Sequence, residues 1–244
     1  MKAFWRHYLL KMFNRLKWLI FPHRCIWCDE IVKYGETECE NCRNKVKFIK
    51  NETCSVCGRD IENCSCGNLK YCFLRNISCF YYENAGAKGI INFKLRFPDN
   101  RKLNEFSKIL ISKIKKSYVG VEFDLITCVP LYRKKLRKRG FNQSALLAEK
   151  ISKELSIDFC EDLIIKIKDT IGQHELNQNE RMKNLKNSFT VNNKYNIKGF
   201  RILLVDDVIT TGSTLNECSK VLLKSGADSV YCSTLAATNH NKEE

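Results

Sequence analysis

Two adjacent acids followed by a hydroxyl-rich loop are the residues whose types and spacing most clearly allow chemistry. They stand in residues 201–214, where an apolar run leads to Asp206 and Asp207. Carboxylates at a strand end can accept hydrogen bonds from sugar hydroxyls or hold water around a Mg²⁺ ion. The loop that opens the next helix offers N–H groups and hydroxyls, which favour a phosphate. The pattern predicts a ribose 5-phosphate site with Asp206 and Asp207 as catalytic candidates and, as the ligand-binding loop, Thr210, Thr211, Gly212, Ser213 and Thr214.

An ordinary strand–turn–helix, capped by Ser213 or Thr214, is the simpler alternative for this stretch. A cap accounts for the hydroxyls, but it gives no reason for two acids in a row. A Walker loop is excluded because the segment lacks a Gly-Lys-Ser/Thr ending.

Closely spaced cysteine pairs form a second group of chemically capable residues. Ten of the 14 cysteines fall between Cys25 and Cys79. Because we expect no cleavable signal peptide ahead of them, reduced thiols that bind metal in the cytosol fit better than disulfides. Two Cys-x-x-Cys pairs are the usual way to close a tetrahedral Zn²⁺ site. The predicted metal ligands are Cys25, Cys28, Cys39 and Cys42 in a first set and Cys54, Cys57, Cys64 and Cys66 in a second set.

The second set is less regular, since Cys64 and Cys66 are one residue closer than the preferred spacing, and Cys72 is an alternative ligand. A catalytic metal would need an open position and usually a His or carboxylate, and only His23 lies at the edge of this region. We therefore expect structural zinc, in a module too poor in apolar residues to fold without it. The remaining cysteines are expected to be buried core thiols: Cys79, Cys128, Cys160, Cys218 and Cys232.

A strongly basic segment follows the strand-like run that ends at Pro130, and residues 133–139 carry six positive charges in seven positions. We expect a loop at the sheet edge where α/β proteins bind ligands. The segment could pair with pyrophosphate, with nucleic-acid phosphates, or with both. Tyr132 and Phe141 could add base stacking, although a core contact is the safer interpretation of Phe141. The ligand-binding candidates in the segment are Arg133, Arg137 and Arg139.

The elements that must position these residues alternate between apolar runs and helical periods, which predicts an α/β fold with a parallel sheet. The candidate strands are 79–82, 125–129, 163–167, 201–205 and 229–235. The candidate helices are 87–94, 103–115, 143–155 and 214–224. Residues 172–189 lack a clean period and look like a long active-site loop, where His174 alone is weak evidence for a general base.

The chain has 244 residues, which suits one large domain or a medium domain with a small module. The expected parts are a basic amphipathic helix at 1–24, a double zinc-finger-like module at 25–78, the α/β domain at 79–237 and a tail at 238–244. The helix could lie on a membrane surface, but docking on a neighbouring domain is favoured. The net charge of +15 favours anionic partners. Charges that interrupt the N-terminal apolar residues exclude a transmembrane span: Arg6, Lys11, Arg15 and Lys17.

The stretch 201–214 closely resembles the phosphoribosyl-diphosphate motif of type I phosphoribosyltransferases, in unbroken register. In that family the acid pair meets the ribose hydroxyls and the loop holds the 5-phosphate. Several features in order resemble the ComF family of competence-associated proteins over residues 20–237. They are the double cysteine pairs, Val-Pro-Leu at 129–131, Arg-Gly-Phe-Asn-Gln-Ser at 139–144, Gln173 with Arg181 and Asn184 downstream, and the acid-pair loop.

This resemblance implies a type I phosphoribosyltransferase-like domain of α/β class, preceded by a small cysteine-rich zinc module. It also implies a role in the uptake of transforming DNA, with the incoming single strand handled at the cytoplasmic side of the membrane. Thr210 departs from purine-salvage relatives, in which a carboxylate at the corresponding position acts near the base nitrogen. The threonine is closer to orotate-type relatives, whose chemistry uses a mobile-loop Lys. Lys166 and Lys168 lie just before the long loop, but no motif fixes either in that role.

Three functions compete on these observations. The favoured one is a ComF-like competence protein that binds single-stranded DNA, phosphoribosyl diphosphate and Mg²⁺. It would be cytoplasmic, with contact to the DNA-uptake machinery at the inner membrane face left open. The second is an active Mg²⁺-dependent phosphoribosyltransferase of nucleotide metabolism whose zinc module is purely structural. There, Mg²⁺ and the arginines of 133–139 would stabilise the departing pyrophosphate. The third is a membrane-surface scaffold that uses the N-terminal helix.

Overall fold

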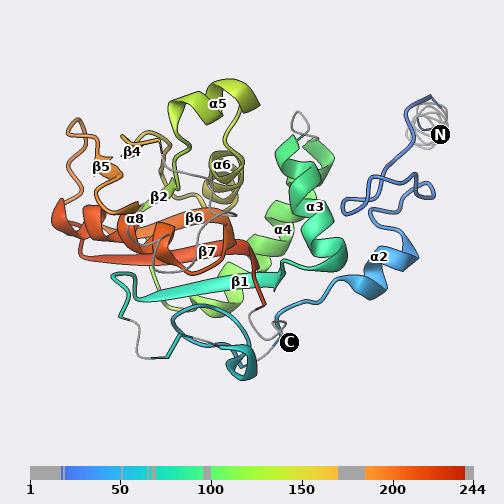
Figure 1. The fold of residues 1–244 in the computed structure, drawn as a ribbon, viewed down its shortest axis with the longest axis horizontal. Coiled ribbons are helices and arrows are strands. Elements are labelled where there is room, and N and C mark those ends of the chain that lie inside the picture. The colour runs from blue at the N-terminus through green and yellow to red at the C-terminus, as the bar shows by residue number, and fades with distance from the viewer. Residues whose placement is uncertain are drawn as a thin grey trace, which may run out of the picture.

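A parallel sheet forms the centre of the molecule (Figure 1). The computed structural model describes residues 18, 20–50, 52–64, 66–67, 70–95, 100–169 and 185–239. Within these residues the sheet has five strands in the order β1-β7-β6-β2-β3, and every neighbouring pair is parallel. The predicted parallel α/β fold is therefore confirmed. The strands are β1 (Arg75–Tyr81), β2 (Leu125–Cys128), β3 (Phe159–Cys160), β6 (Arg201–Ile209) and β7 (Ser229–Ala237).

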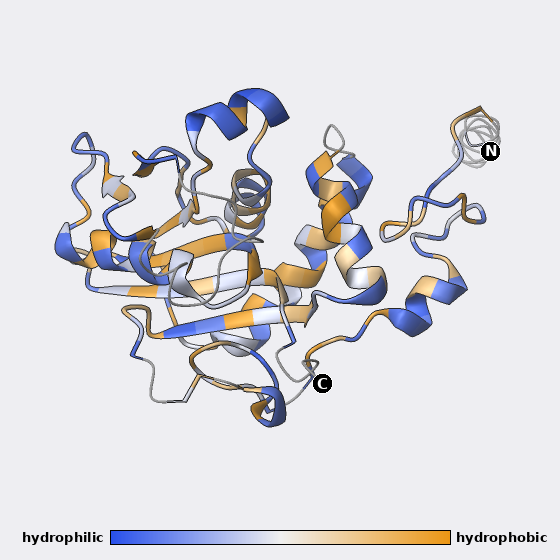
Figure 2. Cartoon of the chain, in the orientation of Figure 1, coloured by the Kyte–Doolittle hydropathy of each residue, from blue (hydrophilic) through white to orange (hydrophobic). Residues whose placement is uncertain are grey.

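Helices cover both faces of this sheet, which explains why the apolar run in β6 does not alternate with polar residues. Leu203 and Val205 belong to the core shared with α3, α4 and α6, whereas Ile202 and Leu204 belong to the core shared with α8. Figure 2 shows β6 as a mostly hydrophobic strand between these layers. The helices are α3 (Asn84–Leu95), α4 (Asn100–Ser117), α6 (Gln143–Leu155) and α8 (Ser213–Lys224).

Several strands differ from the sequence expectations. β6 continues past Val205 through the acid pair, because Asp206 pairs with Thr234 and Ile209 with Ala237 of β7. β1 begins earlier than expected, at Arg75, and the short strand β3 was not expected. Strand pairing, rather than the apolar run itself, sets these limits.

The run 163–167 was expected in the parallel sheet, and this expectation is wrong. Its middle forms β4 (Ile164–Lys166), which pairs antiparallel with β5 (Phe189–Val191) in a separate two-stranded sheet of the described residues. Short apolar runs carry no information about their partner strand, so the pattern could not separate these two sheets. β5 packs against α8, which places the small sheet beside the ligand loop at the start of that helix.

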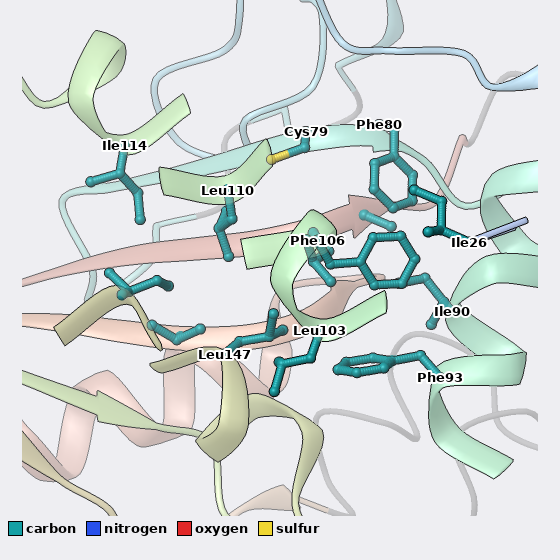
Figure 3. Packing of buried hydrophobic residues seen from close by; sticks show 14 of the residues in the cluster. Ile26, Cys79, Phe80, Ile90, Phe93, Leu103, Phe106, Leu110, Ile114 and Leu147 are labelled. Atoms are coloured by element: carbon teal, nitrogen blue, oxygen red, sulfur yellow. The ribbon is translucent and has the colours of Figure 1, made fainter. Parts of the chain in front are cut away.

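The cysteine-rich segment packs on the α/β domain through one shared core. It contains the helix α2 (Glu40–Lys45), and the buried ring of Trp27 lies 5.1 Å from Phe80 and 5.3 Å from Phe106 between ring centroids. Figure 3 shows Ile26 of this segment beside Phe80 and Phe106. A buried ion pair, Lys102 Nζ to Asp29 Oδ1 at 2.7 Å, adds a polar contact between the segment and α4.

Gly89 of α3 tests how tightly this junction is packed. A Cβ at Gly89 would lie 2.7 Å from Cε3 of Trp27 and 3.3 Å from Cζ of Phe106. We expect Gly89→Ala to lower the free energy of unfolding by about 1–3 kcal/mol through overpacking, although alanine favours a helix over glycine by about 1 kcal/mol. Urea unfolding measures this change. In a Trp27→Phe background the smaller ring leaves room, so the cost should fall by at least about 0.5 kcal/mol; an equal cost in both backgrounds would contradict the contact.

Four of the five cysteines expected in the core are buried: Cys79, Cys128, Cys218 and Cys232. The expectation for Cys160 is wrong, because Cys160 lies in the short edge strand β3 and is only half-buried. Most of the predicted N-terminal helix and the end of the tail lie outside the described residues. Within the described residues, no helix combines the length and the apolarity needed to span a bilayer.

Candidate functional site

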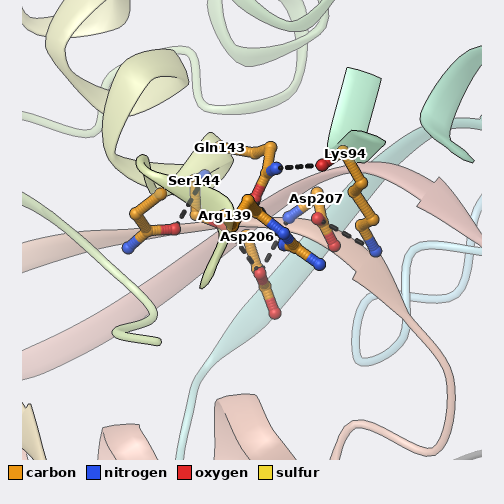
Figure 4. A network of polar contacts seen from close by, with 7 residues as sticks. Lys94, Arg139, Gln143, Ser144, Asp206 and Asp207 are labelled. Carbon is orange, nitrogen blue, oxygen red and sulfur yellow. Dashed lines mark hydrogen bonds and ion pairs between the residues drawn. The ribbon is translucent and has the colours of Figure 1, made fainter. Parts of the chain in front are cut away.

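The acid pair lies at the carboxyl end of β6 and is held by side chains from two helices (Figure 4). The hydroxyl of Ser144 donates to Asp206 Oδ1 at 2.8 Å, and the amide of Asp207 donates to the same oxygen at 2.8 Å. Lys94, at the end of α3, forms an ion pair from Nζ to Asp207 Oδ2 at 3.0 Å. The side chain of Gln143 donates to the carbonyl of Lys94 at 3.3 Å, which ties α6 to α3 above the acids.

Burial and mutual charge control the protonation of this pair. Burial raises the pKa of Asp206 to about 7, and the carboxylate of Asp207 adds to the rise. The Ser144 hydroxyl, the Asp207 amide and the Lys94 charge oppose this rise. Burial lowers the pKa of Lys94, but the Asp207 carboxylate, with a further contribution from Asp206, raises it, so the pKa of Lys94 is raised overall. The site therefore keeps two acids and one lysine close together, at a cost in electrostatic free energy typical of functional sites.

The predicted phosphate loop joins the end of β6 to the start of α8. Gly212 adopts a left-handed φ of 77°, which glycine tolerates best. The hydroxyls of Thr211 and Ser213 contact each other at 2.8 Å, and the Ser213 amide donates weakly to Thr211 Oγ1 at 3.4 Å. Thr210, Gly212 and Thr214 line the neighbouring cavity.

The acid pair and the loop border one cavity of about 370 Å³. Among the described residues, four cationic side chains also line it: Lys94, Lys135, Arg139 and Lys166. Tyr82 and Phe189 supply aromatic surface, whereas Tyr132 and Phe141, the sequence candidates for stacking, are not among the lining residues. Acids, hydroxyls and cations around one cavity match a ligand that has both sugar hydroxyls and phosphates.

The basic run forms a helix, α5 (Arg133–Arg139), and the expectation of a loop is wrong. The helix ends at Gly140, whose amide donates to the carbonyl of Leu136 at 2.7 Å. Residues two apart on a helix point about 200° apart. Residues four apart share a face, and accordingly Lys135 and Arg139 both line the cavity. Arg133 and Arg137 lie on the opposite, exposed side of α5.

Lys166 and Lys168, left open by the sequence, have different positions. Lys166 lines the cavity and its Nζ lies 5.5 Å from the ring centroid of Phe189. Burial lowers the pKa of Lys166, and the nearby charge of Lys135 lowers it further. Lys168 Nζ contacts the carbonyl of Lys186 at 3.5 Å on the exposed surface. His174 and most of the long polar segment lie outside the described residues.

Lys94 and Ser144 are site residues that sequence reasoning missed. Lys94 stands at the end of a helix with no motif around it, and its partner Asp207 is more than a hundred residues away. Ser144 had a signal, because it closes the Asn-Gln-Ser sequence after the basic run. Asn142 caps α6 by accepting from the Ser144 amide at 3.2 Å and donates to the carbonyl of Val129 at 3.0 Å, which positions Ser144 at the acids.

The cysteines gather into the two sets that the spacing predicts. In each set the four sulfurs lie within 4.8 Å of one another. The sulfurs of Cys28 and Cys39 are 3.7 Å apart and those of Cys57 and Cys64 are 3.8 Å apart. A tetrahedron with zinc–sulfur bonds of about 2.3 Å has edges of about 3.8 Å, so both donor sets fit zinc. Cys72 lies outside the second set, and its amide donates to Asn216 Oδ1 at 2.6 Å.

Comparison with known proteins gives the same two-part organisation. Residues 16–73 match the family model described as a double zinc ribbon domain. Residues 142–244 match the family model described as a phosphoribosyl transferase domain. These matches agree with the paired cysteine sets and with the parallel sheet that carries the acid-pair loop.

Curated relatives extend the likeness over most of the chain. Competence protein F of Haemophilus influenzae is 32% identical over 84% of this chain and 99% of its own length. Competence protein ComFC of Bacillus subtilis is 28% identical over 86% of this chain and 93% of its own. DNA utilization protein YhgH of Escherichia coli is 37% identical over 47% of this chain and 50% of its own. The chain therefore belongs to the ComF family of competence proteins, with an N-terminal double zinc ribbon followed by a phosphoribosyltransferase domain.

Proposed function

We propose that this protein acts in DNA uptake during natural transformation, and that its cavity binds phosphoribosyl diphosphate together with Mg²⁺. The names of its relatives, competence protein and DNA utilization protein, support the biological role. The observation that carries the ligand proposal is the meeting of the acid pair, the phosphate loop and several cationic side chains around one cavity of the described residues. We expect the protein to work in the cytoplasm, with contact to the uptake machinery at the inner membrane face.

Each part of the cavity suits one part of the ligand. The loop 210–214 offers backbone amides at the start of α8 to the 5-phosphate. Asp206 and Asp207 accept from the ribose hydroxyls. Lys135 and Arg139 approach the cavity from α5 and would neutralise the pyrophosphate. Mg²⁺ prefers oxygen ligands and usually binds through one or two carboxylates and substrate phosphates, so the acid pair fits it, and the ion would add positive charge at the pyrophosphate.

Single-stranded DNA is the proposed macromolecular partner, and α5 is its proposed binding surface. The helix carries six cationic side chains, of which those facing away from the cavity are exposed. Lysine and arginine bind nucleic-acid phosphates without regard to sequence and release counterions when they do. A basic helix beside the cavity would therefore hold a strand in place whatever its sequence, as a DNA-uptake protein requires.

An active phosphoribosyltransferase is the second candidate, and the cations around the cavity favour it. Breaking the bond to pyrophosphate leaves positive charge on the ribose and negative charge on the leaving group. Asp206 and Asp207 lie where the ribose would bind, and Lys166 and Arg139 line the same cavity. Release of pyrophosphate that depends on an added base would support turnover, and its absence with bound phosphoribosyl diphosphate would support a binding role alone.

Calorimetric titration with phosphoribosyl diphosphate and Mg²⁺ tests the ligand proposal. We expect micromolar affinity for the zinc-loaded wild type and no detectable heat for Asp206→Ala/Asp207→Ala, because both sugar contacts are lost. The control is Asp228→Asn, which changes an exposed acid just before the amino end of β7, at the opposite end of the strands from the acid pair. This variant should bind as wild type does. A folded, zinc-loaded wild type that gives no binding would overturn the ligand proposal and leave α5 as the functional surface.

A further inference from the structure

The segment around the second cysteine set contacts the phosphate loop through two side chains. Arg59 is 3% exposed, and its guanidinium donates to the carbonyl of Thr210 and, at 2.7 Å, to the carbonyl of Thr238. The hydroxyl of Tyr71 donates to the carbonyl of Thr211 at 2.8 Å. Two successive carbonyls of the loop are therefore held by donors from the cysteine-rich module, on chain segments more than a hundred residues away.

These two hydrogen bonds fix the direction of the loop amides. A trans peptide is planar, so its N–H points opposite to its C=O. When the carbonyl of Thr210 points at Arg59, the amide of Thr211 must point away from the module. Likewise the carbonyl of Thr211, bound by Tyr71, turns the amide of Gly212 away from Tyr71. Successive amides aimed to one side form a concave anion site, which is what a 5-phosphate needs.

The ring of Tyr71 also limits what can stand at the centre of the loop. A Cβ at Gly212 would lie 2.9 Å from Cε1 of Tyr71. Gly212 is thus required by its left-handed backbone and by the approach of a ring from the module. Phe73 stacks on Tyr71 with ring centroids 4.9 Å apart, which holds the ring in this position.

The position of Arg59 depends on the turn that carries the second cysteine set. The amide of Cys54 donates to the carbonyl of Arg59 at 2.7 Å, and the amide of Gly58 donates to the carbonyl of Cys54 at 3.0 Å. Gly58 has a φ of 71°, and a Cβ there would lie 2.7 Å from the carbonyl oxygen of Asn76 in β1. A metal bound by Cys54 and Cys57 would hold this turn closed, and with it the backbone of Arg59.

The first cysteine set has a different neighbourhood. The segment that carries it packs on α3 and α4 through Trp27 and through the ion pair of Asp29 with Lys102. The two sets therefore differ in what they support, one the helical layer and the other the ligand loop.

We propose that Arg59 and Tyr71 are positioning residues of the phosphate loop, and that metal in the second cysteine set controls ligand affinity through them. This inference rests on the proposed function, in that the loop binds the 5-phosphate of phosphoribosyl diphosphate. It gives the second zinc a role in ligand binding that the first zinc does not share. By linkage, the ligand must strengthen zinc binding at the second set by the same factor by which zinc strengthens ligand binding.

Tyr71→Phe tests the proposed positioning of the phosphate loop with the smallest possible change. Loss of one hydrogen bond to a loop carbonyl should weaken binding of phosphoribosyl diphosphate by about tenfold. The matched control is Tyr118→Phe, since the Tyr118 hydroxyl donates at 2.6 Å to the carbonyl of Cys232, away from the loop. Hydrogen exchange of a peptide covering 209–216, measured without ligand, should rise in Tyr71→Phe and Arg59→Met and stay unchanged in Tyr118→Phe. Unchanged affinity and unchanged exchange in both module variants would overturn the proposal.

Zinc release to a coloured chelator tests the proposed coupling between the second zinc and ligand binding. With saturating phosphoribosyl diphosphate and Mg²⁺, about one of two zinc equivalents should leave about tenfold more slowly, in line with the linkage. Tyr71→Phe should reduce this protection, and Tyr118→Phe should keep it. If the wild type binds no phosphoribosyl diphosphate, the proposed function fails by itself. The inference is then decided by hydrogen exchange of residues 209–216 in two variants: Cys64→Ser, which loses the second zinc, and Cys39→Ser, which loses the first. Faster exchange in Cys64→Ser supports the inference, and equal exchange in both variants overturns it.

Discussion

Asp206→Asn is expected to stabilise the protein and to weaken ligand binding by about 100-fold. The binding loss follows because a charged acceptor of the sugar hydroxyls is replaced by a neutral one. The amide keeps an oxygen that can accept from the Ser144 hydroxyl and the Asp207 amide. It removes a carboxylate whose pKa burial and Asp207 raise to about 7. We expect the free energy of unfolding at about pH 8, without Mg²⁺ or ligand, to rise on the order of 2 kcal/mol.

The pH dependence of this gain has a definite sign. Because the folded protein holds a proton on Asp206 more tightly than the unfolded chain does, Asp206 costs stability progressively as the pH rises from about 4 to about 7, and the penalty is complete above about pH 7. The penalty shrinks as the pH falls toward the pKa of Asp206 in the unfolded chain, and it is absent below about pH 4. The stabilising effect of Asp206→Asn should therefore be largest at about pH 8 and nearly vanish at about pH 4.

Urea unfolding of wild type and Asp206→Asn at both ends of this pH range measures the effect, and calorimetry on the same samples measures ligand affinity. Asp228→Asn serves as the control, because its exposed side chain should change neither quantity. A variant that is less stable than wild type at about pH 8 would contradict the view that the acid pair is held at an energetic cost for function.

The acid-pair loop and the cysteine sets could be predicted from sequence because their chemistry is local. Asp206 and Asp207 precede the loop directly, and the two cysteines of a Cys-x-x-Cys pair already lie on one turn. The parallel α/β class followed from apolar runs alternating with helical periods. In each case the residues that act together are neighbours along the chain.

Features that depend on distant contacts could not be predicted in this way. Arg59 meets Thr210 across about 150 residues, and nothing in the sequence around Arg59 marks it as part of the loop. Lys94 meets Asp207 in the same manner. The basic run gave no helical period because Leu136 is its one apolar residue, so its helix could not be distinguished from a solvated loop.

Neutralising the exposed side of α5 is expected to lower affinity for single-stranded DNA by about 10²–10³ at low salt. The change replaces four exposed cations that do not line the cavity and leaves Lys135 and Arg139 in place. Each phosphate contact to a single strand contributes about 0.7 to the slope of log affinity against log salt, so the slope should become shallower by about 2–3. The substituted residues, all to Gln, are Arg133, Lys134, Arg137 and Lys138.

Fluorescence anisotropy with a labelled oligothymidylate over a range of salt concentrations measures both quantities. The control removes the same charge from exposed lysines elsewhere, by changing Lys116, Lys194, Lys198 and Lys224 to Gln. Because both variants carry the same net charge, a deficit confined to the α5 variant identifies a site rather than a general attraction. Binding of phosphoribosyl diphosphate should survive in the α5 variant, since its cavity side chains are intact. Equal losses in both variants would mean that the charge of +15 acts diffusely and that α5 is not the DNA-binding surface.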